Sequence, residues 1–247
     1  MPNYRLDLSY DGTRYRGWQR QGNTENTLQA KLEAALEQVC GEKIEAAASG
    51  RTDAGVHARM QVVSFRTQSP LEPQELLRRL RQALPEDMGA LAIQPAQPRF
   101  HARLSCTGKT YLYRIWNSPV PNVFDRRFQT VVEQPLDVAA MEQAAKAFLG
   151  SHDFRGFCSN PNMKKSTVRT VTDISVRCDG PAQDWYFSGD GFLYNMVRIL
   201  MGTLLEVGLG HLCPTQIPEI LAARDRAAAG PMAPAKGLCL WEVRYDG

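Results

Sequence analysis

The order of strand and helix patterns in the first hundred residues constrains the fold more than any other feature of this sequence. Residues 4–10 alternate between apolar and polar side chains, the period of a strand with one buried face. Apolar residues then recur at helical spacing over 28–39, and Gly41 suits the end of that helix. Strand patterns then cover 43–48, 60–66 and 89–94, and a second helical pattern covers 73–84. The predicted order is β-α-β-β-α-β, the ferredoxin-like arrangement.

The second half of the chain again combines strands with helices. Helical patterns cover 137–149 and 192–207, and a short helix is expected after Pro214. Strand patterns cover 105–117, 126–132, 170–178, 184–189 and 238–245. We therefore expect an α+β fold of two ferredoxin-like-related halves, residues 1–104 and 105–247. Their antiparallel sheets would lie side by side, with helices on one face and a cleft between the halves.

Composition excludes several classes of protein. Hydrophobic residues make up 43% of the chain, which favours a folded core over disorder. No stretch approaches the roughly 20 apolar residues of a membrane helix, and the first residues do not resemble a signal peptide. The six cysteines form no C-x-x-C pair and the histidines no H-E-x-x-H motif, so we expect reduced thiols and no metal site. The expected location is the cytoplasm.

Basic residues gather in three places although the net charge is only +3. Residues 14–20 mix three arginines with two aromatic residues, residues 99–127 carry six cations against one acid, and residues 164–169 hold a third group. Each group alone is consistent with a solvated surface. Three such groups with aromatic residues among them favour nucleic acid as the partner.

The stretch SGRTDAG, residues 49–55, is the strongest candidate for chemistry. Asp and Gly are common in turns, so a simple turn is one interpretation. The chain has no phosphate-binding loop, dinucleotide fingerprint or nucleophile elbow, so an enzyme of this sequence would need a cofactor-free mechanism. Asp53 could then serve as nucleophile or base. Arg51 would lower its pKa, while Gly50 and Gly55 would let a substrate approach closely.

Five motifs in order resemble those of the tRNA pseudouridine synthase A (TruA-type) family, and the resemblance covers nearly the whole chain. They are YDGTRYRGWQRQ (10–21), GRTDAGVHA (50–58), FHARLSCTGKTYLYRIWN (100–117), FLYNMVRILMGTLLEVG (192–208) and APAKGLCLWEVRY (233–245).

The resemblance implies a reaction and its partners. Members of the family convert uridine to pseudouridine in the anticodon stem-loop of tRNA, at positions 38–40, without a metal or small-molecule cofactor. The base leaves ribose C1′, rotates and rejoins through C5. They act as homodimers. Asp53 matches the catalytic aspartate of the family, and whether it attacks C1′ or C6, or acts otherwise, stays open.

Other site residues follow from their positions in the matching motifs. Tyr111 would stack on the flipped uracil, and Arg198 would form an ion pair with Asp53. Arg51 could fill the gap that the flipped base leaves, and Leu238 would pack near the target base. The plainer interpretations are a core tyrosine, an arginine that extends from its helix to solvent, and a core leucine.

Several basic residues are expected to contact phosphates, which would set the position of the RNA. They are Arg14, Arg16, Arg20, Lys109, Lys164 and Lys165. His57 and His101 lie in matching motifs, but structural roles are favoured for both. Two rival functions remain at this point: a non-catalytic RNA-binding module, and a different cofactor-free enzyme such as a small-molecule lyase or phosphatase. The intact GRTDAG motif disfavours the first, and a steep salt dependence of tRNA binding would disfavour the second.

Overall fold

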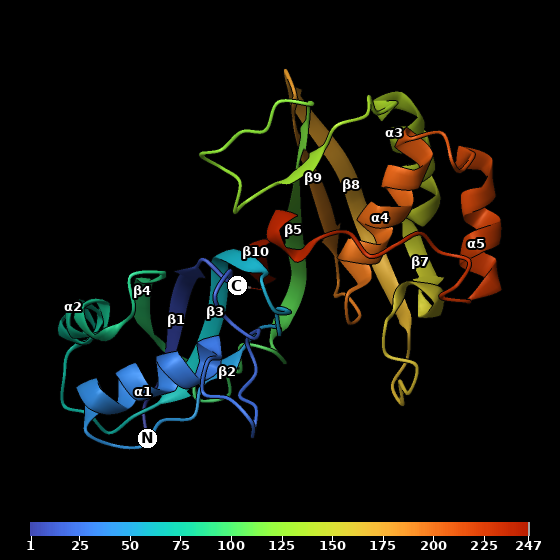
Figure 1. Ribbon diagram of the computed structural model, residues 1–247. Coiled ribbons are helices and arrows are strands. Elements are labelled where there is room, and N and C mark those ends of the chain that lie inside the picture. Colours follow the sequence, from blue (N-terminus) through green and yellow to red (C-terminus); the bar gives the residue numbers. More distant parts are fainter. Residues whose placement is uncertain (247) are drawn as a thin grey trace. The chain divides into compact units, whose positions relative to one another are not determined.

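A computed structural model describes residues 1–246, and this part of the chain divides into two compact units (Figure 1). The first unit comprises residues 1–107 and 239–246, and the second comprises residues 108–238. The last strand, β10 (Leu238–Tyr245), therefore falls mostly in the first unit, although the sequence placed it in the second half. Cys239 and Leu240 of β10 pair in parallel with His57 and Ala58. Such long-range pairing leaves no trace in local periodicity.

The first unit follows the predicted order of elements. They are β1 (Asn3–Tyr10), α1 (Leu28–Cys40), β2 (Ala47–Ala48), β3 (His57–Arg66), α2 (Pro73–Ala83) and β4 (Met88–Ala96). Strand β1 lies between β3 and β4 and is antiparallel to both, and β2 pairs antiparallel with β3. Helices α1 and α2 contact each other beside these strands (Figure 1).

The spacing of apolar residues along the elements of this unit determines which side chains form its core. Strand β1 buries every second side chain, and Leu6 and Leu8 are fully buried. Helix α1 starts where the hydroxyl of Thr27 accepts a hydrogen bond from the backbone N–H of Ala30. It ends at Gly41, whose φ of 73° is the left-handed conformation that glycine adopts readily.

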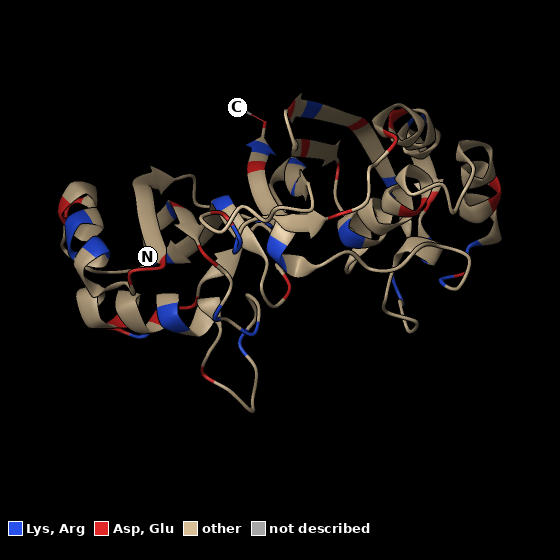
Figure 2. Cartoon of the chain, turned by 45° about the horizontal axis from the view of Figure 1, so that its top comes forward, with Lys and Arg blue, Asp and Glu red and all other residues tan. Residues whose placement is uncertain are grey.

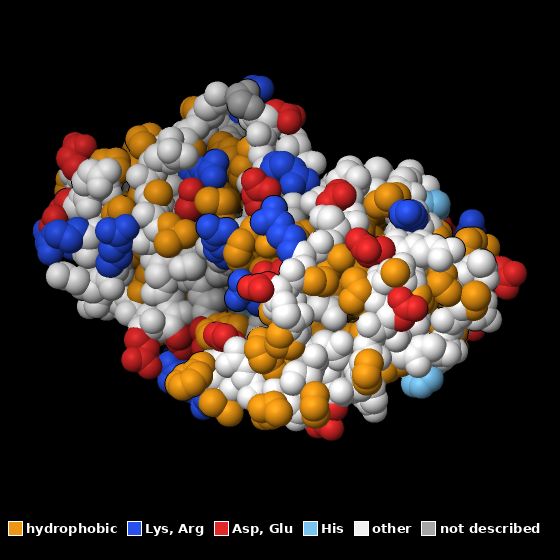
Figure 3. Space-filling model, turned by 90° about the horizontal axis from the view of Figure 1, so that it is seen from above, with side chains coloured by type: hydrophobic (Ala, Val, Ile, Leu, Met, Phe, Trp, Pro, Cys, Tyr) orange, Lys and Arg blue, Asp and Glu red, His pale blue; other side chains and the backbone are white. Residues whose placement is uncertain are grey.

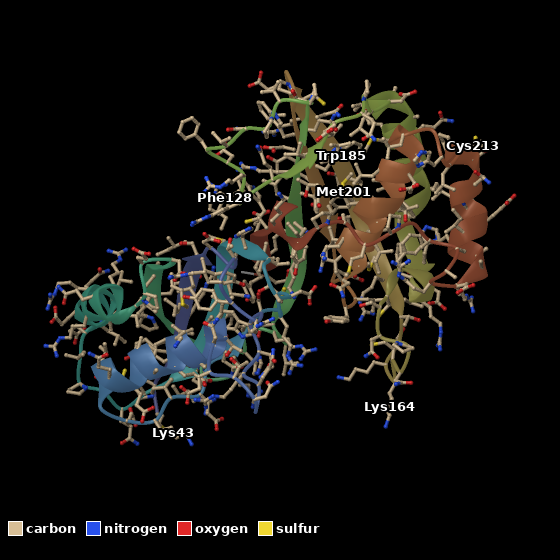
Figure 4. All side chains as sticks on the ribbon, in the orientation of Figure 1. Lys43, Phe128, Lys164, Trp185, Met201 and Cys213 are labelled. Atoms are coloured by element: carbon tan, nitrogen blue, oxygen red, sulfur yellow. The ribbon has the colours of Figure 1, made fainter. Side chains whose placement is uncertain are left out.

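The second unit has a longer set of elements. They are β5 (Cys106–Asn117), β6 (Thr130–Val132), α3 (Val138–Ala145), β7 (Gly150–Asp153), β8 (Val168–Asp179), β9 (Ala182–Gly189), α4 (Met196–Gly208) and α5 (Ile217–Ala223). Strands β5, β9, β8 and β7 are neighbours in that order and antiparallel, and β6 pairs in parallel with β5. Trp185 on β9 and Met201 on α4 are fully buried in its core (Figure 4).

The α+β class is confirmed, and several details differ from the prediction. Two pairings are parallel, so the sheets are mixed and not purely antiparallel. The strand expected over 43–48 is reduced to Ala47–Ala48, and the polar strand β7 was missed. Helix α4 begins at Met196 and not at 192, because Asn195 has a left-handed φ of 60°. The ferredoxin-like relation of the halves and the cleft between them stay predictions.

No helix in the described part of the chain is long and apolar enough to cross a membrane.

Candidate active site

The loop that carries Asp53 connects β2 to β3 and turns tightly. The backbone N–H of Val56 donates to the carbonyl of Asp53 at 3.1 Å, and Gly55 has a φ of 77°. The Asp53 side chain is half-buried, whereas Arg51 is exposed. The turn suggested by the sequence is therefore present, and it presents a carboxylate at the edge of the core.

The motif over residues 10–21 packs against this loop. A Cβ on Gly12 would lie 2.0 Å from the carbonyl oxygen of Val56, and one on Gly17 would lie 3.0 Å from that of Thr52. The backbone N–H of Trp18 donates to the same Thr52 carbonyl at 2.9 Å. Only glycine fits at these contacts, so the spacing of glycines in residues 10–21 is matched to the loop.

Buried polar side chains lie under the loop, and the sequence reasoning did not identify them. The hydroxyl of Ser49 donates to Oε1 of Gln61 at 2.6 Å, and Nε2 of Gln61 donates to the carbonyl of Gly50 at 2.9 Å. The Tyr10 and Thr52 hydroxyls lie 2.7 Å apart. Desolvation raises the pKa of Tyr10 well above its usual value, so this phenol stays protonated.

The two histidines of the matching motifs have structural surroundings. Nδ1 of His57 accepts from the backbone N–H of Gly12 at 3.1 Å and lies 3.1 Å from the Asp11 carboxylate. Nδ1 of His101 accepts from the backbone N–H of Arg103 at 3.1 Å. Both rings organise nearby backbone, in agreement with the role favoured from sequence.

The arginines of residues 14–20 differ in their surroundings. The Arg14 guanidinium donates twice to Oδ2 of Asp87, at 2.9 and 2.7 Å. Arg20 lies 3.5 Å from a carboxylate oxygen of Glu33. Arg16 is exposed. Arg14 and Arg20 are also exposed on their outer sides, but each already has a carboxylate partner that a phosphate would have to share.

The lysines predicted to contact RNA lie in the second unit. Lys109 is half-buried on β5, and Lys164 and Lys165 are exposed on the loop before β8. Lys164 projects from the end of that loop, away from the helices and strands of its unit (Figure 4). Elsewhere Lys and Arg are interspersed with acidic residues along the chain and on the face seen in the space-filling view (Figures 2 and 3).

Tyr111 is a buried residue of β5, with 8% of its surface exposed. The rings of Tyr111 and Phe192 pack edge to face, with 5.3 Å between their centroids and an interplanar angle of 89°. Leu238 is 4% exposed at the start of β10. Phe192 was not singled out from the sequence, where it is the first apolar residue of the helix predicted over 192–207.

Arg198 lies on the first turn of α4 and is held by two acceptors of its own unit. Its Nε donates to the carbonyl of Ala233 at 2.8 Å, and its Nη1 donates to Oδ1 of Asn195 at 3.1 Å. Nδ2 of Asn195 in turn donates to the hydroxyl of Ser159 at 2.7 Å. Neither Asn195 nor Ser159 was identified from the sequence, since their contact joins residues 36 positions apart in the chain. The ion pair between Arg198 and Asp53 stays a prediction.

The candidate residues thus form two groups. The first unit holds Asp53 and Arg51 with the arginines of residues 14–20, and the second holds Tyr111, Arg198, Leu238 and the three lysines. Within residues 1–246, no three His, Cys, Asp or Glu side chains are grouped to hold a metal ion. A half-buried carboxylate on a glycine-rich loop can act as a nucleophile or a base.

Comparison with known proteins adds independent findings. A family model described as "tRNA pseudouridine synthase" matches residues 8–104 and 144–246. A curated "tRNA pseudouridine synthase A" from Moorella thermoacetica is 47% identical over 246 residues, covering 99% of this chain and 100% of the relative. A "tRNA pseudouridine synthase A 2" from Bacillus cereus is 42% identical over 245 residues, with coverage of 99% and 100%.

A solved structure, of a Cbf5–Nop10–Gar1 complex, aligns with a TM-score of 0.38 and 16% identity, covering 82% of this chain and 45% of that chain.

Proposed function

The chain belongs to the tRNA pseudouridine synthase family, and from this premise we propose that it isomerises uridine to pseudouridine at positions 38–40 of the tRNA anticodon stem-loop, with Asp53 as the catalyst. The full-length identity to relatives named tRNA pseudouridine synthase A supports the substrate class.

One observation carries the assignment of Asp53: the separate motif over residues 10–21 packs its backbone directly against the Asp53 loop. Gly12 and Gly17 leave no room for a side chain where they contact residues 52–56, so the loop has a defined conformation. A catalytic carboxylate requires a loop of fixed geometry, and this packing supplies one.

The reaction balances without any added reagent. The C1′–N1 bond of uridine breaks, a C1′–C5 bond forms, the C5 proton is lost and N1 gains a proton. A carboxylate can attack C1′, add to C6 or remove a proton, and each route begins with Asp53 ionised. Because the target base is stacked in the stem-loop, it must leave the stack before Asp53 can reach it.

The remaining site residues have supporting roles in this proposal. Tyr111 stacks on the flipped base, Leu238 packs beside it, Arg198 pairs with Asp53, and Arg51 fills the gap left in the stack. The predicted cleft between two related halves is part of the same proposal, as are the homodimer and the cytoplasmic location.

The basic residues differ in how accessible they are to phosphates of the RNA. Lys164 and Lys165 are exposed, and so is Arg16, which leaves them open to phosphate oxygens. Arg14 and Arg20 would act together with their partners Asp87 and Glu33. A contact through Lys109 would come from a half-buried position on β5.

The test is to map pseudouridine in tRNA after incubation with the purified protein. We expect new pseudouridine only at positions 38–40, and none with an Asp53→Asn preparation purified in parallel. Tight tRNA binding without pseudouridine formation would support the non-catalytic RNA-binding alternative. Modification confined to another arm of the tRNA would contradict the proposed substrate position.

A further inference from the structure

Four buried polar side chains form a cluster beneath the loop that carries Asp53. Tyr10 comes from β1, Gln61 from β3, and Ser49 and Thr52 from the loop segment itself; none is more than 5% exposed. The residue paired with Gln61 across the sheet is the apolar, fully buried Leu8. The polar side chain of Gln61 therefore lies beside an apolar residue in the buried core, next to the Asp53 loop.

Gln61 is the centre of this cluster. Its Oε1 accepts from the Ser49 hydroxyl at 2.6 Å, and its Nε2 donates to the Gly50 carbonyl at 2.9 Å. The same Nε2 lies 3.4 Å from the Tyr10 hydroxyl, which can then donate to Thr52 Oγ1 at 2.7 Å. One side chain thus contacts two consecutive loop residues directly and a third through Tyr10.

The energetics of burial favour a role in conformation over a role in stability. A buried amide must be hydrogen-bonded to avoid a large cost, and an apolar side chain of similar size would fill the same space without that demand. What the amide adds is direction, because its donor and acceptor meet their partners in only one arrangement of the loop.

We propose that Gln61 is a positioning residue for Asp53, which holds residues 49–52 so that the Asp53 carboxylate has a fixed place, with Tyr10 extending this hold to Thr52. The inference rests on the proposed function of Asp53 and deepens it. Neither Gln61 nor Tyr10 is required to touch the substrate.

The test separates chemistry from binding. Gln61→Met removes the amide and keeps a similar volume, and Tyr10→Phe removes one hydroxyl. We expect the single-turnover rate of pseudouridine formation at saturating tRNA to fall about 30-fold for Gln61→Met and about 5-fold for Tyr10→Phe. The Kd for tRNA should stay within about threefold in both, because the RNA contacts are unchanged.

A double variant sharpens the test. If both residues act through one cluster, Gln61→Met with Tyr10→Phe should be no slower than Gln61→Met alone. Effects that multiply would overturn the shared mechanism.

Ser64→Ala is the matched control. Ser64 is also a buried hydrogen-bonding residue of β3, but its hydroxyl accepts from the backbone N–H of Ala102 at 3.0 Å and donates to the carbonyl of Ala47 on β2 at 3.5 Å, and neither partner belongs to residues 49–52. We expect its rate to equal that of the wild type. A full rate in Gln61→Met, or an equal loss in Ser64→Ala, would overturn the inference, since the second result would indicate general loosening of the strand.

Two further outcomes are distinguishable. Should Gln61→Met fail to fold, Tyr10→Phe and Thr52→Val take its place, and full rates in both overturn the inference. An inactive wild type, or an active Asp53→Asn variant, contradicts the proposed function itself. An inactive Asp53→Asn variant beside a fully active Gln61→Met variant contradicts only the role of Gln61.

Discussion

The Asp53 loop of the first unit and the start of α4 in the second unit hold charged side chains in different ways. Beneath Asp53, the supporting groups are neutral and almost fully buried. Arg198 instead depends on a backbone carbonyl and on Asn195, a residue with a left-handed backbone conformation. The first arrangement is built into the sheet core, and the second is attached to a helix end and a loop.

This difference predicts different consequences of mutation. Changes beneath Asp53 should disturb the backbone of the loop, and close contacts there should make some changes intolerable. Changes around Arg198 should leave the fold intact and alter the direction of one guanidinium group.

Gly12→Ala should strongly destabilise the protein, because its Cβ would lie 2.0 Å from the Val56 carbonyl oxygen. We expect the free energy of unfolding to fall by about 3 kcal/mol or more, as measured by denaturant titration. Gly22→Ala is the control, since a Cβ there meets nothing within 4 Å, and its effect should stay within about 0.5 kcal/mol. Equal stability of the two variants would disprove close packing at the loop.

Arg198→Lys should keep the charge and lose the forked donor that reaches both Ala233 and Asn195. We expect the single-turnover rate to fall about 50-fold, or roughly 2.3 kcal/mol, with the free energy of unfolding changed by less than about 1 kcal/mol. The exposed Arg155 provides the comparison, and Arg155→Lys should react at the wild-type rate. A fully active Arg198→Lys variant would show that charge alone is sufficient at this position.

Two substitutions of Asn195 separate the effect of its backbone conformation from the effect of its side chain. Asn195→Gly and Asn195→Ala both remove the contacts to Arg198 and Ser159, so each should slow the reaction about 10-fold. Glycine tolerates the φ of 60° and alanine does not, so the glycine variant should be more stable by about 1 kcal/mol in thermal and denaturant unfolding. A glycine variant with the wild-type rate would rule out a positioning role for the amide.

The basic residues should show the smallest effects. Lys164→Ala combined with Lys165→Ala should weaken tRNA binding a few-fold and reduce the slope of log K against log salt by roughly 1 to 2. Arg14→Ala should change this slope by less than about 0.5, since Arg14 is already paired with Asp87. Fluorescence titration across a salt series measures both. A larger change for Arg14→Ala would reverse the proposed ranking.

Sequence reasoning succeeded where the signal is local. The alternation of residues 4–10 and the helical spacing over 28–39 gave β1 and α1, because each depends on which face of one element is buried. Asp53 was found because the GRTDAG motif is itself a short, local pattern. Hence the first unit was predicted well in outline.

The missed features depend on partners far away in the chain. Strand β7 is a short polar segment that becomes a strand by pairing with β8, and β10 joins the first unit through β3. Gln61 looks like one polar residue in a strand until its contact with Gly50 is known. The side chain of Asn195 likewise contacts Ser159, 36 residues away in the chain.

The most direct test of the account is the release of tritium from tRNA that carries 5-tritiated uridine, with Asp53→Asn compared against the wild type in single turnover. The substitution keeps the shape of the side chain and removes its charge. We expect the rate to fall at least about a thousandfold while the Kd for tRNA stays within about threefold. Tritium release by Asp53→Asn within about tenfold of the wild-type rate would contradict the assignment of Asp53 as the catalyst.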